Sequence, residues 1–137
     1  MANASPINVV TLRNASPVLF ARVVDSEGTN ITQATISSIA YSAYLLDKDW
    51  PRDRNNRTTV TGHSATDVAV ASSVFDTLQT TDTERWTVDA TGYNFRYQLD
   101  VSTNACFADA GRNYLIEFTL TPASGQAIIV QFVVRVL

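Results

Sequence analysis

The sequence predicts an all-β protein, built as an antiparallel β-sandwich of about seven to nine strands. Val, Thr, Ala and Ser dominate the 137 residues, whereas helix-favouring Lys occurs once, as Lys48. Short segments in which apolar and polar residues alternate follow one another, separated by turns rich in Gly, Pro, Asn and Asp. No segment keeps a helical period over three turns, so the sequence favours sheets stacked face to face.

Composition places the chain among folded proteins of a single domain. Hydrophobic residues make up 45% and charged residues only 17%, which is typical of a chain with a buried core. The formal net charge of −3 argues against nucleic acid or an anionic membrane as a partner. The N-terminus has neither a basic start nor an apolar run, so we expect no signal peptide and synthesis in a cytoplasm.

The first strands are expected at residues 7–12 and 18–24, each directly after a copy of Asn-Ala-Ser-Pro. Proline cannot donate to a ladder and is typical of a strand start. We interpret residues 1–17 as an extended arm or edge strand, and residues 18–137 as the sandwich itself. A turn at residues 25–30, with Gly28 as its permissive position, follows the second strand.

The remaining strands are predicted from alternation. In the segment 114–120, Tyr114, Ile116, Phe118 and Leu120 are expected to face inward, and Leu115 to face outward. Two polar loops are expected at residues 48–64 and 100–112. The expected strands are residues 36–46, 68–70, 74–78, 93–99, 114–120 and 127–137.

The segment from Asp89 to Leu99 predicts the type of sandwich. Tyr93, Phe95, Tyr97 and Leu99 alternate with polar residues, and Asp89 precedes Tyr93 by four positions. This spacing resembles the tyrosine corner of immunoglobulin-like sandwiches, in which a Tyr hydroxyl ties a strand to its preceding corner. We therefore predict an immunoglobulin-like sandwich with Asp89 and Tyr93 as its fold-defining corner.

No catalytic arrangement is expected. Residues 62–66, Gly-His-Ser-Ala-Thr, depart from a nucleophile elbow because Thr66 stands where glycine is needed. One His and one Cys cannot build a zinc site, and Cys106 is expected to be a small buried hydrophobe. Asp25, Glu27 and Asn30 have the chemistry for calcium but not the spacing of a calcium loop. We expect neither an enzyme nor a cofactor or metal.

The order of segments resembles a known group of proteins. A Val-Leu-Phe-Ala-Arg strand (18–22) leads to Asp-Ser-Glu-Gly (25–28), then Ile-Thr-Gln-Ala (31–34) and the strand with Ile-Ala-Tyr (39–41). With the later strands and a final hairpin, this resembles sandwich domains of tailed-phage virion proteins, in particular the N-terminal domain of baseplate upper proteins. The resemblance covers roughly residues 18–136. It implies a structural role without catalytic residues.

The resemblance leads to a functional hypothesis of a non-enzymatic virion subunit, an accessory or decoration protein on the capsid or on the tail and baseplate. It would be made in the host bacterial cytoplasm, would contact other virion proteins and would self-associate. The alternative hypothesis is a carbohydrate- or receptor-binding adhesion module. An aromatic residue beside arginines in a polar loop is typical of an interface anchor. The candidate contact residues are Ile7, Val9, Val10 and Leu12 in the arm, and Trp50, Arg52 and Arg54 in the loop.

Overall fold

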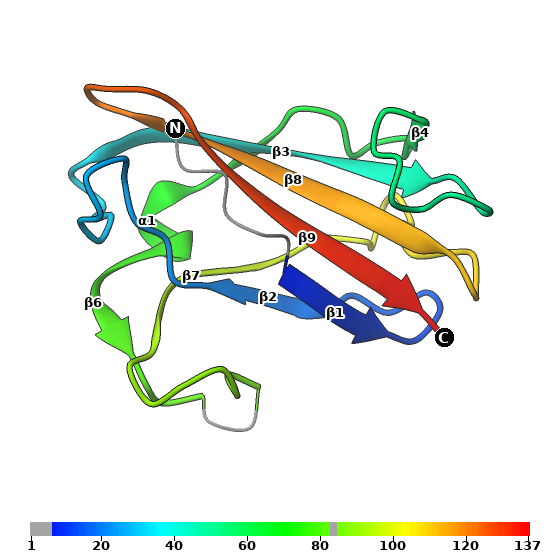
Figure 1. The fold of residues 1–137 in the computed structure, drawn as a ribbon, viewed down its shortest axis with the longest axis horizontal. Helices are drawn as coiled ribbons and strands as arrows, with labels where there is room; N and C mark the ends of the chain where they lie inside the picture. The colour runs from blue at the N-terminus through cyan, green and yellow to red at the C-terminus, as the bar shows by residue number, and fades with distance from the viewer. Residues whose placement is uncertain (1–6, 83–84) are drawn as a thin grey trace.

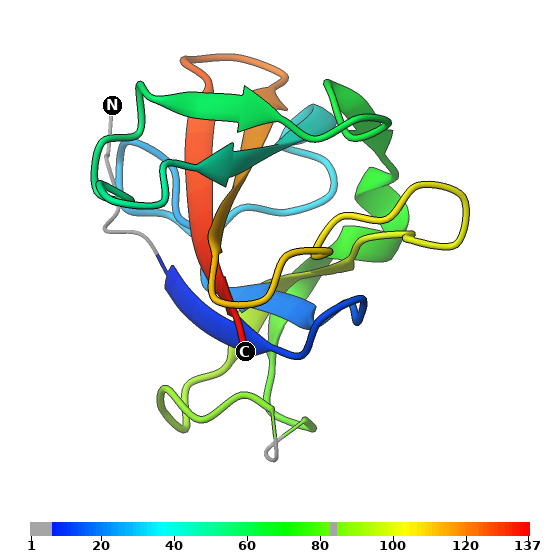
Figure 2. The same cartoon turned by 90° about the vertical axis from the view of Figure 1, so that its right-hand side faces the viewer.

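The structure, a computed structural model, describes residues 7–82 and 85–137, which form two β-sheets packed face to face (Figures 1 and 2). The all-β sandwich predicted from the sequence is confirmed. The only helix in the described residues is α1 (Val70–Ser73), a single turn. The larger sheet contains β1 (Ile7–Thr11), β9 (Ile128–Val136), β8 (Asn113–Pro122) and β3 (Ile36–Leu46), followed by β4 (Arg57–Thr59) and β5 (Thr66–Val68), which both pair with β3; the smaller sheet contains β2 (Val18–Ala21), β7 (Tyr93–Gln98) and β6 (Val74–Gln79).

Strand order follows from the pairing. β9, β8 and β3 are antiparallel neighbours, and β2, β7 and β6 form the second antiparallel set. β1 is different, because it runs parallel to β9, with Ile7 opposite Phe132. Immunoglobulin constant-type sandwiches place strands A, B, E and D in one sheet and strands C, F and G in the other. Here β2, β7 and β6 correspond in order to B, E and D, and β3, β8 and β9 to C, F and G, whereas β1 lies beside β9 instead of in the sheet of β2. The immunoglobulin-like assignment stays a prediction, with which this order is compatible.

The core lies between the two sheets and is centred on Phe118 of β8. The Phe118 ring meets Phe95 of the smaller sheet edge to face, with 5.0 Å between ring centroids. Phe132 and Tyr41, from the two strands beside β8, lie 5.7 Å from Phe118 by the same measure. Alternation builds this layer, since Tyr114, Ile116, Phe118 and Leu120 are all buried, as predicted.

Leu115 departs from the predicted pattern. It was expected to face water, yet none of its surface is exposed. Its neighbours in register are Tyr44 on β3 and Val133 on β9, both of which lie on the outer face of the larger sheet. Apolar side chains on both sides of Leu115 therefore cover it, although it points away from the main core.

The predicted loop 48–64 is partly sheet, because β4 pairs with the end of β3. Residues 68–70 also differ from the prediction, since β5 ends at Val68 and α1 begins at Val70. The long strand predicted at residues 36–46 is confirmed at both ends as β3. Residues 1–17 contain edge strand β1 where the structure describes them, and residues 1–6 lie outside the described residues.

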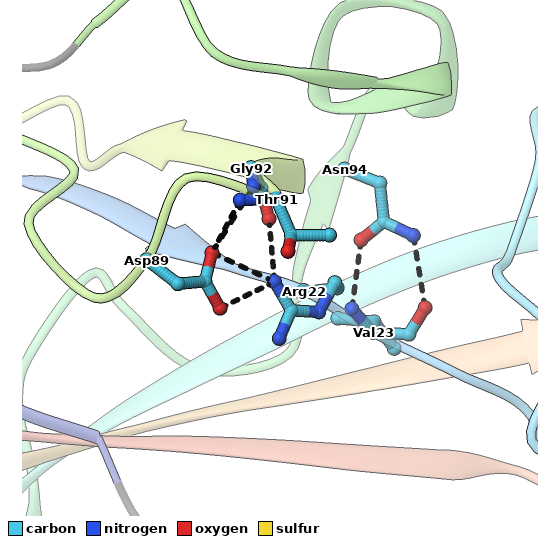
Figure 3. A network of polar contacts seen from close by, with 6 residues as sticks. All are labelled: Arg22, Val23, Asp89, Thr91, Gly92 and Asn94. Carbon is cyan, nitrogen blue, oxygen red and sulfur yellow. Dashed lines mark hydrogen bonds and ion pairs between the residues drawn. The ribbon is translucent and has the colours of Figure 1, made fainter.

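The corner before β7 is held differently from the prediction (Figure 3). The Asp89 carboxylate accepts the backbone N–H groups of Thr91 and Gly92 at 3.0 and 3.1 Å, and pairs with Arg22 at 2.8 Å. Within the described residues the Tyr93 hydroxyl has no hydrogen-bond partner. Asp89 therefore ties this corner to the segment after β2 through an arginine, and the tie predicted through the Tyr93 hydroxyl stays a prediction.

The Tyr93 ring turns away from the main core. It packs with Phe20 (4.7 Å between centroids), Phe75 and Trp86 in a second, smaller cluster. The register between β6 and β7 shifts between Val74–Phe95 and Gln79–Tyr93, and such an irregularity re-aims side chains. The simple alternation assumed for residues 93–99 therefore fails at Tyr93.

Asn94, one of the polar residues that alternate with Tyr93, Phe95 and Tyr97, is also buried. Its side chain accepts the Val23 N–H at 2.7 Å and donates to the Val23 carbonyl at 2.9 Å (Figure 3). A buried amide is tolerated because both its acceptor and its donor are satisfied. The Asn94 amide thus satisfies the backbone groups of Val23, which lies just beyond the end of β2.

A hydroxyl-to-backbone tie of the tyrosine-corner kind occurs one strand later. Tyr114, near the start of β8, is buried, and its hydroxyl accepts the Asp109 N–H at 3.1 Å. Its ring packs edge to face on Phe107, and Ile116, two positions on, lies in the main core. A hydroxyl-to-backbone hydrogen bond therefore fixes the end of the loop 100–112 to β8.

Candidate interaction surface

The four candidate residues at the start of the chain divide between the two sides of β1. Ile7 and Val9 are half-buried and pack against the main core. Val10 and Leu12 are 60% and 66% exposed. Because successive side chains of a strand point to opposite faces, β1 contributes one face to the core and offers the other to solvent. Only Val10 and Leu12 are available to a partner as side chains.

Leu137 belongs to the same surface and was missed from the sequence. It is 60% exposed, and its N–H donates to the Thr11 carbonyl at 2.9 Å. This bond places Leu137 at the end of β1, and the parallel register, in which Thr11 pairs with Val136, continues toward Leu12 and Leu137. Parallel pairing between the first and last strands has no local signal in the sequence, so this proximity appears only in three dimensions. We call Val10, Leu12 and Leu137 the β1 patch.

The second candidate surface is the loop that carries Trp50. Trp50 is 73% exposed, although the backbone around it is ordered by hydrogen bonds. The Asp47 carboxylate accepts the N–H groups of Asp49 and Trp50 at 3.0 and 2.8 Å, and the Trp50 carbonyl accepts the Asp53 N–H at 3.0 Å. A large aromatic ring is thereby presented to solvent on a defined turn, as an interface anchor requires.

The arginines near Trp50 do not act as one basic patch. Arg52 is exposed, whereas Arg54 is half-buried. Arg57 lies over the Tyr44 ring, 3.9 Å from its centroid, and 4.0 Å from the Glu117 carboxylate. Its charge is therefore directed onto the outer face of the larger sheet, where a cation and an aromatic ring attract each other.

The two candidate surfaces lie at opposite edges of the larger sheet. The order β1-β9-β8-β3-β4 places four inter-strand steps between β1 and the loop beside β4. At about 4.8 Å a step, this amounts to roughly 19 Å. The structure therefore does not bring Trp50, Arg52 and Arg54 together with Val10 and Leu12, and a partner would meet them separately.

His63 serves the fold. It is 2% exposed, its Nδ1 lies 2.7 Å from the Tyr41 hydroxyl, and its Nε2 lies 2.8 Å from the Asn104 carbonyl. The Asn104 carbonyl can only accept, so Nε2 carries the proton and Nδ1 accepts the Tyr41 hydroxyl proton. With both nitrogens occupied, His63 joins loop 60–65 to loop 100–106.

Other reactive groups are also engaged or buried. Burial raises the pKa of the Cys106 thiol to about 12, which keeps it protonated near neutral pH. Asp25 accepts the N–H groups of Glu27 and Thr29 at 2.9 and 3.0 Å, so it stabilises its own turn. Among the residues that the structure describes, no cluster of three or more His, Cys, Asp or Glu side chains has the arrangement of a metal site.

A cavity of about 360 Å³ opens between two turns at one end of the sandwich. It is lined by the turn at residues 25–27, by residues 31–36 and by the hairpin at residues 122–128. Its only charged side chains are Asp25 and Glu27. The lining contains no His, Cys or Lys side chain, so it offers no nucleophile paired with a base.

Within residues 7–82 and 85–137, no helix has the length and apolar character needed to cross a membrane.

Comparison with models of protein families, with curated proteins and with solved structures finds no match. The class that the geometry defines is a two-sheet β-sandwich with an exposed edge strand and a solvent-facing tryptophan turn.

Proposed function

We propose that this chain is a non-enzymatic structural subunit of a tailed-phage virion, which binds neighbouring virion proteins on the capsid or on the tail and baseplate. The observation that carries the proposal is the exposed edge of β1 with the β1 patch beside it. Unpaired backbone groups at a sheet edge recruit further strands, and exposed apolar side chains add contact area. The resemblance of residues 18–136 to virion sandwich domains supplies the phage context of the proposal.

The proposed mechanism is repeated surface complementarity. In a symmetric particle each copy occupies an equivalent position, so many weak contacts add up to stable attachment. The acidic balance of the chain, with a formal net charge of −3, favours protein partners over nucleic acid. The subunit would be made in the host bacterial cytoplasm and incorporated into the particle there.

Mass spectrometry of purified particles tests the virion role. Particles of the phage that encodes this chain are purified from a lysate by banding on a density gradient, and their proteins are digested for mass spectrometry. We expect peptides of this protein at a constant ratio to the major capsid or tail protein across the band. Its absence from intact particles, together with its presence in the soluble fraction of the lysate, would contradict the proposal.

A carbohydrate-binding adhesion module is the second candidate, and Trp50 favours it. An exposed indole on an ordered turn is suited to stack against a sugar ring. A glycan array with the isolated protein tests this function, with Trp50→Ala as the variant that should lose binding. Val88→Ala is the matched control, because Val88 is also exposed and lies on a different loop. An array without signal would exclude the glycans on the array as ligands of this protein.

A further inference from the structure

The sheet edges of this sandwich differ in how well they are protected against pairing. Strands at a sheet edge are normally very short, or they contain charges, proline or a bulge, and these features discourage pairing with a further strand. β4 and β5 have three residues each and contain Arg57 and Asp67, respectively. β6 contains Asp76 and is out of regular register with β7. β2 has only four residues.

β1 follows Pro6, as β2 follows Pro17, but it is longer than β2 and has none of these protections within the strand itself. Its five residues, Ile-Asn-Val-Val-Thr, contain no charge, no proline and no glycine. It pairs with β9 in continuous register, without a bulge. Among the edges described, β1 is therefore the one whose backbone is ready to accept another strand.

The register with β9 identifies which backbone groups of β1 are free. The Thr11 carbonyl accepts from the Leu137 N–H, so Thr11 faces β9. Backbone groups alternate in direction along a strand, so Ile7 and Val9 face β9 as well. The N–H and C=O groups of Asn8 and Val10 consequently point away from the sheet, toward any strand that joins it.

From these observations we infer that β1 pairs antiparallel with β1 of a second copy, about a twofold axis at Val9, and joins the two larger sheets into one. The inference rests on the proposed assembly function and names its first partner. Asn8 of one copy would lie opposite Val10 of the other, with their outward N–H and C=O groups bonded to each other. Such a contact is isologous, so it closes as a dimer.

The composition of β1 fits a second copy. In the antiparallel alignment Ile7 lies opposite Thr11 and Val9 opposite Val9, so every inward-facing pair consists of β-branched residues, which pack well on a pleated surface. β1 has no charged residue, so the pairing brings no like charges of β1 together. Arg135 sits beside Val10 on β9, and three inter-strand steps of about 4.8 Å would separate it from its copy by roughly 14 Å, beyond the Debye length at physiological salt.

Light scattering and sedimentation equilibrium over a wide concentration range test the dimer. We expect the mass to approach twice the 15.0 kDa of the chain. Val10→Lys introduces a charge at the pairing edge and should weaken the dimer at least tenfold. Val88→Lys is the control, since Val88 is 68% exposed on the β6–β7 loop and should leave the dimer unchanged. Circular dichroism should show both variants folded, because both valines are largely exposed.

Oxidative cross-linking tests the register. Residues opposite each other in a non-hydrogen-bonded antiparallel pair have Cα atoms about 4.5 Å apart, which a disulfide can span. Val9→Cys should therefore cross-link two copies, and Val10→Cys should do so far less. The natural Cys106 is buried, so the unsubstituted chain should remain uncross-linked.

Some results would overturn the inference. These are a monomer at every concentration, a dimer indifferent to Val10→Lys, or efficient cross-linking at Val10 in place of Val9. A monomeric chain that is nevertheless found in purified particles would overturn the dimer alone, because its partner strand would then come from another virion protein. A dimer that is absent from particles would overturn the virion role alone.

Discussion

Two tyrosines, each near the start of a strand and after a turn with glycine, have different roles in this sandwich. The Tyr114 hydroxyl accepts a backbone N–H at 3.1 Å, whereas the Tyr93 ring packs in a small aromatic cluster. Both follow an aspartate, Asp109 or Asp89, by five or four positions. The sequence pattern favoured Tyr93 because of this spacing. Whether a tyrosine hydroxyl bonds to the backbone depends on whether the preceding loop folds so that a free backbone group lies within its reach.

Replacing each tyrosine by phenylalanine separates these roles. Tyr114→Phe leaves the Asp109 N–H without its partner and should lower the free energy of unfolding by about 1 kcal/mol. Tyr93→Phe keeps the ring and its packing, so its effect should stay within about 0.5 kcal/mol. Urea unfolding of both variants measures the difference. Equal losses would mean that the Tyr93 hydroxyl has a bond as important as that of Tyr114.

The salt bridge at Asp89 predicts an acid-side dependence of stability. The hydrogen bond from Arg22, with those from Gly92 and Thr91, holds the pKa of the Asp89 carboxyl below its ordinary value of 3.8. A carboxyl whose pKa is lowered by folding stabilises the folded chain above its unfolded pKa, and this contribution is lost as the pH falls further. The melting temperature should therefore decline below about pH 4.

Asp89→Asn tests the source of this dependence. The amide oxygen can still accept the N–H groups of Thr91 and Gly92, but it has no charge to titrate. The variant should thus show a shallower decline in melting temperature between neutral and acidic pH than the original chain. Asp53→Asn is a suitable control, because Asp53 is an exposed loop aspartate. An unchanged pH profile in Asp89→Asn would place the dependence on other carboxyls.

At the level of elements, two glycines that precede strands, Gly92 before β7 and Gly111 before β8, differ in the space around them. Gly92 precedes β7 with a φ of +106°, and a Cβ there would collide with the backbone carbonyl of Gln79. Gly111 precedes β8 with a φ of +78°, and a Cβ there would meet nothing within 4 Å. Both backbones are strained for any other residue, but only at Gly92 do β6 and β7 approach too closely for a side chain.

The pair Gly92→Ala and Gly111→Ala isolates this close approach. Gly111→Ala should cost about 1–2 kcal/mol from the left-handed backbone alone. Gly92→Ala should cost clearly more, because β6 and β7 must also move apart. Thermal or urea unfolding gives both values. Similar losses would show that the β6–β7 ladder gives way without cost.

How well an element could be predicted depended on where its neighbours come from. β3 and β8 alternate over many residues, so the bounds of β3 and the inward side chains Tyr114, Ile116, Phe118 and Leu120 of β8 followed from the sequence, whereas β8 extends beyond its predicted bounds at both ends. β4, β5 and α1 are short and are defined by contact with β3 or β7, which no local pattern reveals. Leu115 was misjudged for the same reason, since its burial comes from Tyr44 and Val133, distant in sequence. The burial of Asn94 against Val23 has no local signal either.

The candidate surface was predicted in part. Val10, Leu12 and Trp50 are indeed exposed, whereas Ile7 and Val9 are packed against the core and Leu137 joins the surface unexpectedly. Period-two alternation already separates Ile7 and Val9 from Val10 in the sequence. The side that faces a core is decided by pairing with β9, more than a hundred residues away, so the sequence left it open.

At the scale of the whole molecule, β1 is part of the domain, which changes the expected result of removing it. A detachable arm would leave the sandwich intact. Deleting residues 2–13 should instead lower the free energy of unfolding by about 2–4 kcal/mol, because Ile7 and Val9 lose their half-buried contacts and β9 becomes an edge. Urea unfolding measures this loss.

A matched pair of double variants distinguishes packing from edge pairing. Ile7→Ala with Val9→Ala removes only inward-facing side chains and should reproduce much of the loss in stability. Asn8→Ala with Val10→Ala removes only outward-facing ones and should leave the free energy of unfolding nearly unchanged. If the deletion has no effect on stability, β1 is held by weaker contacts than its burial indicates.

The parallel pairing of β1 with β9 also has a consequence for how the protein forms in the cell. β1 leaves the ribosome well before β9, the strand with which it pairs, with Ile7 opposite Phe132. Until β9 has been synthesised, the most aggregation-prone edge of the protein has nothing to pair with inside its own chain. Contacts so distant in sequence slow folding. Newly made chains should therefore depend most on chaperones in the interval between the emergence of these two strands.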